Sequence, residues 1–182
     1  MTPDRVFTSP RTLIIGNSGS GKTWLATRMA AAAACPHTPL DNIYWIDQLA
    51  LQKRGAIAAS LLITEAAAGD RWVIEGVYGW LIDAAIPRAT QLIWLDLPWS
   101  ESEAGLLARG PMGVSDTEFD GLIAWARGYW TRQTSSSHAA HAKIFAAFNG
   151  AKLRLASRAD VAAVGTRRRE GQGTGPLDLD TK

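Results

Sequence analysis

The sequence predicts an α/β protein in which a doubly wound parallel β-sheet is covered by helices on both faces. Short, continuously apolar runs alternate along the chain with longer helix-like segments, which is typical of parallel β-α-β units buried on both sides. A glycine-rich segment also joins the first apolar run directly to the first helix-like segment. The chain of 182 residues is long enough for one such domain, which we expect from residue 11 to residue 165.

Apolar runs mark the expected strands of this sheet. The four strong candidates are Leu13–Ile15, Trp72–Ile74, Gln91–Leu97 and Lys152–Leu155. A fifth run, Ile43–Ile46, is a weaker candidate and would supply the second strand.

Helix-like segments separate these runs. The predicted helices are Thr23–Ala34, Gly55–Ala68, Ser100–Ala108, Asp116–Gln133 and Ser137–Phe148. Asp116 is placed to cap one of them, and Ser157 with Asp160 forms a Ser-x-x-Asp capping pattern at the start of another.

Composition excludes several other classes of protein. An apolar fraction of 47% excludes a disordered or collagen-like chain. Cys35 is the single cysteine, which excludes a disulfide framework and a thiolate metal site. No apolar run approaches the roughly 18 residues of a transmembrane helix, and the first residues contain no signal-peptide core. We therefore expect a cytoplasmic protein.

The last segment, from residue 166 to residue 182, is predicted to be a flexible tail. It is rich in glycine and shows neither helical nor strand periodicity. The net charge of the chain is +2, and Arg167–Arg169 carry part of it within this tail. The body is therefore nearly neutral, which argues against a dedicated nucleic-acid-binding protein.

A phosphate-binding motif is the strongest functional signal in the sequence. Residues 16–23 match the pattern G-x-x-x-x-G-K-[ST] between a predicted strand and a predicted helix. Glycines let the backbone curl so that N–H groups face phosphate oxygens, and the helix N-terminus favours the same anion. The residues expected to bind ATP are Gly16, Asn17, Ser18, Gly19, Ser20, Gly21, Lys22 and Thr23.

Two side chains of the motif have expected roles of their own. Lys22 would reach the β- and γ-phosphates, and the hydroxyl of Thr23 would ligate Mg²⁺. The alternative is a glycine-rich turn with an incidental lysine, but the flanking strand and helix favour nucleotide binding.

Acidic residues accompany three other predicted strands. Asp41 lies by the second strand, Glu75 ends the third and Asp96 ends the fourth. Ligands of open α/β sheets bind at the carboxyl ends of strands. One carboxylate there would hold a magnesium-bound water, and another would orient or deprotonate an acceptor hydroxyl. A helix cap or an ion pair is the alternative, most strongly for Asp96.

Five segments together resemble those of the small adenylate-kinase-like P-loop proteins, most closely the subgroup named DNA topology modulation proteins. The segments are LIIGNSGSGKTWLA, LDNIYW, WVIEGVYG, LIWLDLP and NGAKLRLASRADV, and they span about residues 11–164. The resemblance implies a five-stranded parallel sheet of order 2-3-1-4-5. It also implies phosphoryl transfer from ATP to a small acceptor.

The resemblance implies roles for single residues as well. Glu75 matches an aspartate that acts near Mg²⁺ in adenylate kinases but is one methylene longer, so the expected metal residues are Thr23 and Glu75. Asp41 matches the acidic residue on the acceptor side. Residues Asn149–Lys152 resemble the turn that lies against adenine.

The lid over the transferring phosphoryl group differs most from the family. Such kinases carry several arginines there, whereas residues 99–111 contain only Arg109. Arg109 would stabilise the charge of the transferring group, with a solvated helix-end arginine as the alternative. Arg127 and Arg132 follow five residues apart and are weaker candidates.

Aromatic and histidine residues give weaker signals. The aromatic residues that follow the second and third predicted strands are Tyr44, Trp45, Tyr78 and Trp80. They would either stack on an acceptor or belong to the core. His138 and His141 are three residues apart on a predicted helix, with no third metal ligand apparent.

These observations predict an ATP- and Mg²⁺-dependent kinase of a small acceptor, which the resemblance suggests is a nucleotide or nucleoside. Its expected catalytic residues are Lys22, Asp41, Glu75 and Arg109. We expect a monomer or dimer with no membrane partner. The alternative is a nucleotide-binding regulatory or nucleic-acid-associated protein with little turnover, which the sparse lid and the basic tail favour and the neutral body disfavours.

Overall fold

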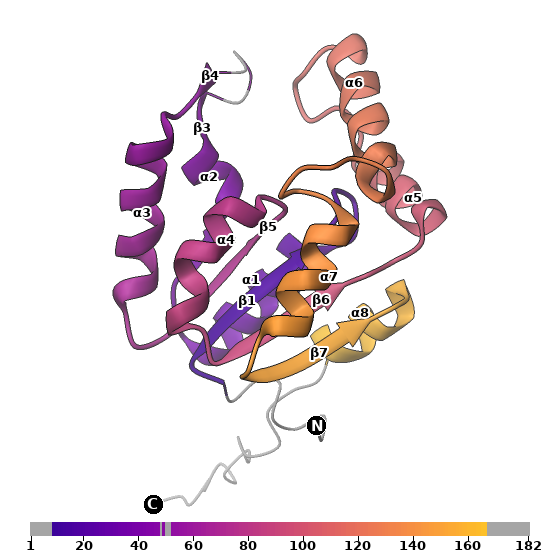
Figure 1. Cartoon of the computed structure of the whole chain (residues 1–182). Coiled ribbons are helices and arrows are strands. Elements are labelled where there is room, and N and C mark those ends of the chain that lie inside the picture. The colour runs from indigo at the N-terminus through magenta and orange to yellow at the C-terminus, as the bar shows by residue number, and fades with distance from the viewer. Residues whose placement is uncertain (1–8, 48, 50–51, 167–182) are drawn as a thin grey trace, which may run out of the picture.

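The main sheet of the protein contains five parallel strands in the order β2-β5-β1-β6-β7 (Figure 1). The structure is a computed structural model that describes residues 9–166 except 48, 50 and 51. Counted along the chain, the strand order is the expected 2-3-1-4-5. The strands are β1 (Arg11–Gly16), β2 (His37–Pro39), β5 (Trp72–Gly76), β6 (Gln91–Leu95) and β7 (Ala151–Leu155).

Helices cover both faces of this sheet, with α3, α4 and α7 on one face and α1 and α8 on the other (Figure 1). The α-helices are α1 (Lys22–Ala33), α2 (Leu40–Tyr44), α3 (Ala56–Ala68), α4 (Gly79–Ala85), α5 (Trp99–Arg109), α6 (Asp116–Arg127), α7 (His138–Ala147) and α8 (Arg158–Gly165). Two short 3-10 helices follow α4 and α6, namely η2 (Ile86–Arg88) and η3 (Gly128–Trp130).

Alternate residues of β1 belong to two separate parts of the core. Leu13 and Ile15 pack with residues of α3 and α4, whereas Ile14 packs with residues of α1. All three side chains are fully buried. A parallel sheet covered on both faces requires this continuous apolar run, and each buried aliphatic side chain contributes about 1.5–3 kcal/mol.

The prediction that Ile43–Ile46 forms the second strand of the main sheet was wrong. That segment forms the end of α2 and part of β3 (Trp45–Asp47), which pairs antiparallel with β4 (Gln52–Lys53) in a separate two-stranded sheet. The second strand of the main sheet is β2, which pairs only with β5 at the sheet edge. Its sequence His-Thr-Pro contains no large aliphatic residue, so it gave no apolar signal.

Helix boundaries differ from the prediction at α6. This helix ends at Arg127 rather than Gln133, and η3 follows it. Its cap is Ser115 rather than Asp116, because the Ser115 hydroxyl accepts from the amide of Glu118 in a capping box. Helix α4 was not predicted at all, whereas the capping box predicted at the start of α8 is present.

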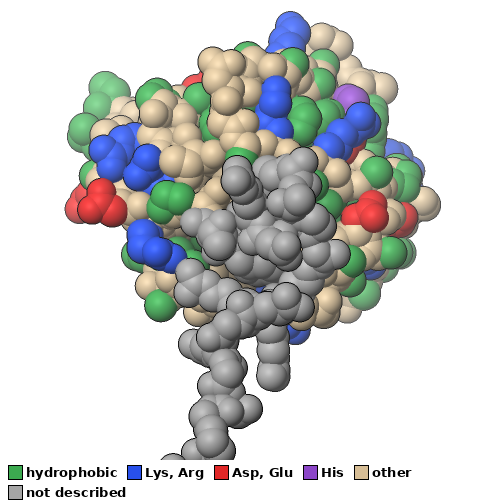
Figure 2. Space-filling model, turned by 90° about the horizontal axis from the view of Figure 1, so that it is seen from below, with side chains coloured by type: hydrophobic (Ala, Val, Ile, Leu, Met, Phe, Trp, Pro, Cys, Tyr) green, Lys and Arg blue, Asp and Glu red, His purple; other side chains and the backbone are tan. Residues whose placement is uncertain are grey.

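Charged and uncharged side chains are mixed on the face of the molecule that Figure 2 shows. Figure 2 shows Lys and Arg side chains there separated by hydrophobic and uncharged ones. The arginines of the predicted tail lie outside the described residues, so the tail and the nucleic-acid alternative stay predictions. No helix within the described part of the chain is long and apolar enough to cross a membrane.

Candidate functional site

The phosphate loop connects β1 to α1 at the carboxyl edge of the sheet. Gly19 has a φ of 78° and Gly21 a φ of 93°, which are left-handed conformations that glycine adopts without strain. A Cβ atom on Gly19 would lie 2.1 Å from the carbonyl oxygen of Ser102 in α5. The loop therefore needs glycine at this position for its conformation and for its packing.

Hydrogen bonds within the loop and to neighbouring helices hold it in place. Asn17 is buried, and its Nδ2 donates to the carbonyl oxygen of Ala126 in α6 over 2.9 Å. Its Oδ1 accepts from the amide of Ser18, also over 2.9 Å. Arg158 at the start of α8 donates to the carbonyl oxygen of Gly19 over 3.1 Å. The loop is thus anchored to α6 and to α8.

Lys22 begins α1 and is buried against the loop. Its Nζ donates to the carbonyl oxygen of Asn17 over 2.8 Å. Burial lowers the pKa of Lys22, the carboxylates of Glu75 and Asp41 oppose this shift, and the guanidinium of Arg109 adds to it. The structure therefore brings the other three predicted catalytic residues close enough to act electrostatically on Lys22.

Thr23 and Glu75 form an oxygen-rich pair beside the loop. The Thr23 hydroxyl donates to Glu75 Oε1 over 2.8 Å, and His37 Nε2 lies 3.9 Å from the same oxygen. Burial would raise the pKa of Glu75, but contacts with His37 and the charge of Lys22 outweigh burial and hold this pKa below its usual value. An ionised carboxylate and a hydroxyl are hard oxygen ligands of the kind Mg²⁺ prefers, so the pair fits this metal.

Asp41, which is predicted to act on the acceptor, lies in the first turn of α2. It follows β2 by two residues, and the last residue of β2, Pro39, is in register with Glu75 on β5. The Asp41 side chain is exposed, and its Oδ1 accepts a hydrogen bond from the Tyr78 hydroxyl over 2.8 Å. Parallel strands thus place both predicted carboxylates at one edge of the sheet.

The aromatic residues near Asp41 form one cluster. Tyr44 stacks on Tyr78 with ring centroids 4.1 Å apart and planes 16° apart. The centroids of Trp45 and Trp80 lie 4.8 Å and 6.4 Å from that of Tyr44. Tyr78 belongs to the buried core, and Tyr44 and Trp80 pack against it, which supports the core interpretation for these three.

The three candidate lid arginines differ in their surroundings. Arg109 is exposed at the end of α5 and makes no side-chain hydrogen bond or ion pair with any described residue. Arg127 is paired with Glu103 at 2.9 Å. Arg132 is half-buried over the ring of Trp125, and its Nε and Nη1 atoms have no hydrogen-bond partner among the described residues. Burial lowers the pKa of Arg132.

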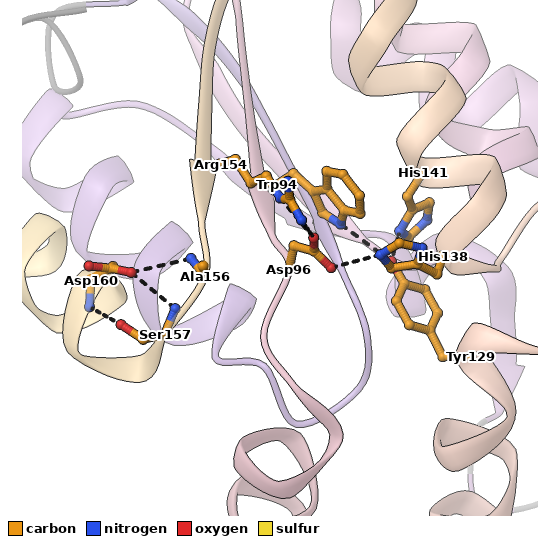
Figure 3. Close-up of polar contacts among 9 residues, drawn as sticks. All are labelled: Trp94, Asp96, Tyr129, His138, His141, Arg154, Ala156, Ser157 and Asp160. Atoms are coloured by element: carbon orange, nitrogen blue, oxygen red, sulfur yellow. Dashed lines mark hydrogen bonds and ion pairs between the residues drawn. The ribbon is translucent and has the colours of Figure 1, made fainter.

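The carboxylate of Asp96 forms ion pairs and is not in contact with Thr23 or Glu75, the residues predicted to hold Mg²⁺. Figure 3 shows its carboxylate between His138 of α7 and Arg154 of β7. Oδ1 lies 3.0 Å from His138 Nε2, and Oδ2 accepts from Arg154 Nε over 2.8 Å. Of the two interpretations left open by the sequence, the ion pair is the one that the structure supports.

His141 forms a buried network that the sequence did not indicate. Its Nε2 lies 3.0 Å from the carbonyl oxygen of Val77, which can only accept, so Nε2 carries the proton. The Tyr129 hydroxyl must then donate to Nδ1, over 2.7 Å. Burial lowers the pKa of His141 to about 3, so the ring is neutral at physiological pH.

The prediction that the turn Asn149–Lys152 lies against adenine was wrong. Ala151 begins β7 and is in register with Gln91, which in turn pairs with Thr12 near the start of β1. The turn therefore lies at the amino ends of the strands, whereas the phosphate loop follows the carboxyl end of β1. The predicted strand Lys152–Leu155, which follows this turn directly, already implied that position, whereas the resemblance in sequence pointed the other way.

Comparisons with known proteins identify the fold of the chain. No family model matches it, and no curated protein matches it in sequence. A gluconokinase from Sinorhizobium meliloti matches with a TM-score of 0.52 and 13% identity, covering 86% of this chain and 89% of the other. A shikimate kinase from Bacteroides thetaiotaomicron matches with a TM-score of 0.54 and 17% identity, covering 86% and 94%. The chain therefore has the fold of P-loop kinases of small molecules, and the narrower subgroup suggested by its sequence stays a prediction.

Proposed function

We propose that the protein transfers the γ-phosphoryl group of ATP to a hydroxyl group of a small molecule. The observation that carries this proposal is the hydrogen bond between Thr23 and Glu75 beside the buried Lys22, because it joins the phosphate loop to an ionised carboxylate on the neighbouring strand. A phosphate loop alone supports only nucleotide binding. Asp41, whose charge also acts on Lys22, adds a second carboxylate and favours transfer to a bound acceptor.

Thr23 and Glu75 are the residues that would hold Mg²⁺. The ion would neutralise charge on the β- and γ-phosphate oxygens. Lys22 would contact the same phosphates through its ammonium group. Arg109, which has no side-chain partner among the described residues, would stabilise the charge that spreads over the transferring group.

Asp41 would act on the acceptor. In the transfer step, the bond between the γ-phosphorus and the β–γ bridging oxygen breaks, and a bond from the γ-phosphorus to the acceptor oxygen forms. Asp41 orients the acceptor hydroxyl and accepts its proton, and ADP leaves with the bridging oxygen. Catalysis of this kind is mainly positioning and charge stabilisation, which a fixed site provides.

The acceptor that we propose carries no phosphate of its own, so a nucleoside or another hydroxyl compound fits better than a nucleotide. Between residues 37 and 55 the only lysine or arginine residues are Lys53 and Arg54. Arg54 donates to the carbonyl oxygen of Ile43 over 2.9 Å, and Lys53 lies over the ring of Tyr44. The two solved structures are named for gluconate and shikimate, which also favours a non-nucleotide acceptor.

Transfer of a γ-phosphate label from MgATP tests this proposal. The acceptor panel pairs each nucleoside with its monophosphate and adds sugar acids, polyols and other small alcohols. We expect label in a non-phosphorylated hydroxyl compound, and no transfer by the Lys22→Ala variant. Label in nucleoside monophosphates would contradict the acceptor class, and tight MgATP binding without transfer to any compound would favour a nucleotide-binding regulator.

A further inference from the structure

Three side chains from separate segments meet on the acceptor side of the site. Asp41 lies in α2, Trp45 begins β3, and Tyr78 is the residue before α4, two residues beyond the end of β5. These elements lie side by side at one end of the sheet (Figure 1). Trp45 Nε1 lies 3.2 Å from the Tyr78 hydroxyl oxygen, which lies 2.8 Å from Asp41 Oδ1.

The direction of these hydrogen bonds follows from the chemistry of the donors. An indole N–H can only donate, so the Tyr78 oxygen accepts from Trp45. The single proton of the phenol is then free to donate to the carboxylate of Asp41. Burial and the charge of Asp41 raise the pKa of Tyr78, so the phenol keeps its proton and remains a donor throughout the physiological range.

The Tyr78 ring is held more firmly than the carboxylate that it contacts. Tyr78 is 9% exposed, lies in the main core cluster and stacks on Tyr44. Asp41 is exposed on a helix of only five residues, where a free side chain would sample several rotamers. The hydrogen bond from Tyr78 occupies Oδ1 and leaves Oδ2 as the oxygen available to an acceptor hydroxyl.

We infer that Tyr78, oriented by Trp45, is a positioning residue that fixes the carboxylate of Asp41 for the acceptor. This inference rests on the proposed role of Asp41 in the transfer reaction. It adds two residues outside the phosphate loop, and it explains why aromatic side chains gather beside an exposed carboxylate.

The test removes only the hydroxyl of Tyr78. In the Tyr78→Phe variant we expect kcat for transfer to fall about ten-fold, the size of one lost hydrogen bond to a charged group, with KM for ATP unchanged. Tyr44→Phe is the matched control, because it removes a phenol hydroxyl from the same stacked pair without touching Asp41. Equal rates for the two variants would overturn the inference.

A double-mutant cycle separates positioning from a general structural effect. If Tyr78 acts through Asp41, then Tyr78→Phe should change the residual rate less than two-fold when Asp41 is already replaced in Asp41→Asn. A ten-fold loss in both backgrounds would show that Tyr78 acts independently of Asp41, and would overturn the inference. Thermal unfolding of each variant confirms that the proteins compared are folded.

A spectroscopic readout tests the hydrogen bonds without any acceptor. In protein labelled with 5-fluorotryptophan, the ¹⁹F signal of Trp45 is assigned by its loss in Trp45→Phe. We expect this signal to shift further in Tyr78→Phe, which removes the partner of the indole N–H, than in Tyr44→Phe, which keeps that hydrogen bond. A signal that does not shift in Tyr78→Phe would overturn the inference. If wild-type protein transfers label to no acceptor, the proposed function fails, while this signal still decides whether the contact between Trp45 and Tyr78 exists.

Discussion

The proposed nucleotide side and the proposed acceptor side of the site hold their charged groups in different ways. On the nucleotide side, Lys22 is buried and bonded to a backbone carbonyl of its own loop. On the acceptor side, Asp41 is exposed and is held by Tyr78, which lies 37 residues further along the chain. The ammonium group of Lys22 is therefore held by local backbone geometry, whereas the carboxylate of Asp41 is held by a contact with a distant side chain.

Removal of the loop lysine should have the largest effect. In Lys22→Ala we expect transfer to fall about 10²–10³-fold, because the phosphates lose a fixed positive charge that is matched to the transition state. The melting temperature should stay close to that of the wild type. Lys53→Ala, which removes an exposed lysine from the acceptor side, is the control and should change the rate less than two-fold. Retained transfer in Lys22→Ala would contradict the proposal that Lys22 stabilises charge on the nucleotide side of the site.

A methyl group added to the phosphate loop should lower the stability of the protein. Gly19→Ala places a Cβ atom 2.1 Å from the Ser102 carbonyl oxygen at a φ of 78°, and we expect the free energy of unfolding to fall by about 2–4 kcal/mol. Gly121 in α6 is the control, since a Cβ atom there meets nothing within 4 Å. Gly121→Ala should stabilise the protein by about 0.5–1 kcal/mol. Urea unfolding of both variants measures the difference, and equal stabilities would show that the loop is less tightly packed than described.

His141 contacts the segment between the two sides, because its Nε2 donates to the carbonyl oxygen of Val77, which lies between Glu75 and Tyr78 in the chain. The pKa of His141 is about 3 in the folded protein and about 6.5 in an unfolded chain. Between these values only the unfolded chain binds the proton, so stability falls as the pH falls. We expect a loss of about 2 kcal/mol by pH 5 from this residue. Urea unfolding at pH 7 and pH 5 should show that His141→Gln lacks this part of the loss, whereas an unchanged slope would mean that His141 titrates normally.

The sequence predicted the nucleotide side well because its information is local. The motif at residues 16–23 lies between a strand and a helix, as its pattern requires. Glu75 was also placed at the carboxyl edge, because it ends the predicted third strand. Asp41 lies at the same edge because it follows β2, whereas the predicted strand Ile43–Ile46 begins after Asp41 and did not imply this position. The fold class and the strand order are confirmed by the structure and by its likeness to solved kinases.

The acceptor side could not be predicted to the same extent. Strand β2 is three residues long and lacks large aliphatic side chains, so the more apolar segment Ile43–Ile46 was chosen in its place. The partners of Tyr78 and His141 depend on how α2, α4 and α7 pack, which no spacing in the sequence shows. Asp96 illustrates the same limit, because its two partners lie 42 and 58 residues away.

The most direct test of the central claim measures where the γ-phosphate label goes in wild-type protein and in Asp41→Asn. Both proteins are saturated with MgATP, and calorimetry provides the dissociation constant of each. We expect the wild type to place label in an organic product, and Asp41→Asn to lose at least about 10²-fold of this transfer while it binds MgATP as tightly as the wild type. Equal transfer by the two proteins, or loss of MgATP binding in Asp41→Asn, would contradict the proposal that one edge of the sheet holds a separate nucleotide side and acceptor side.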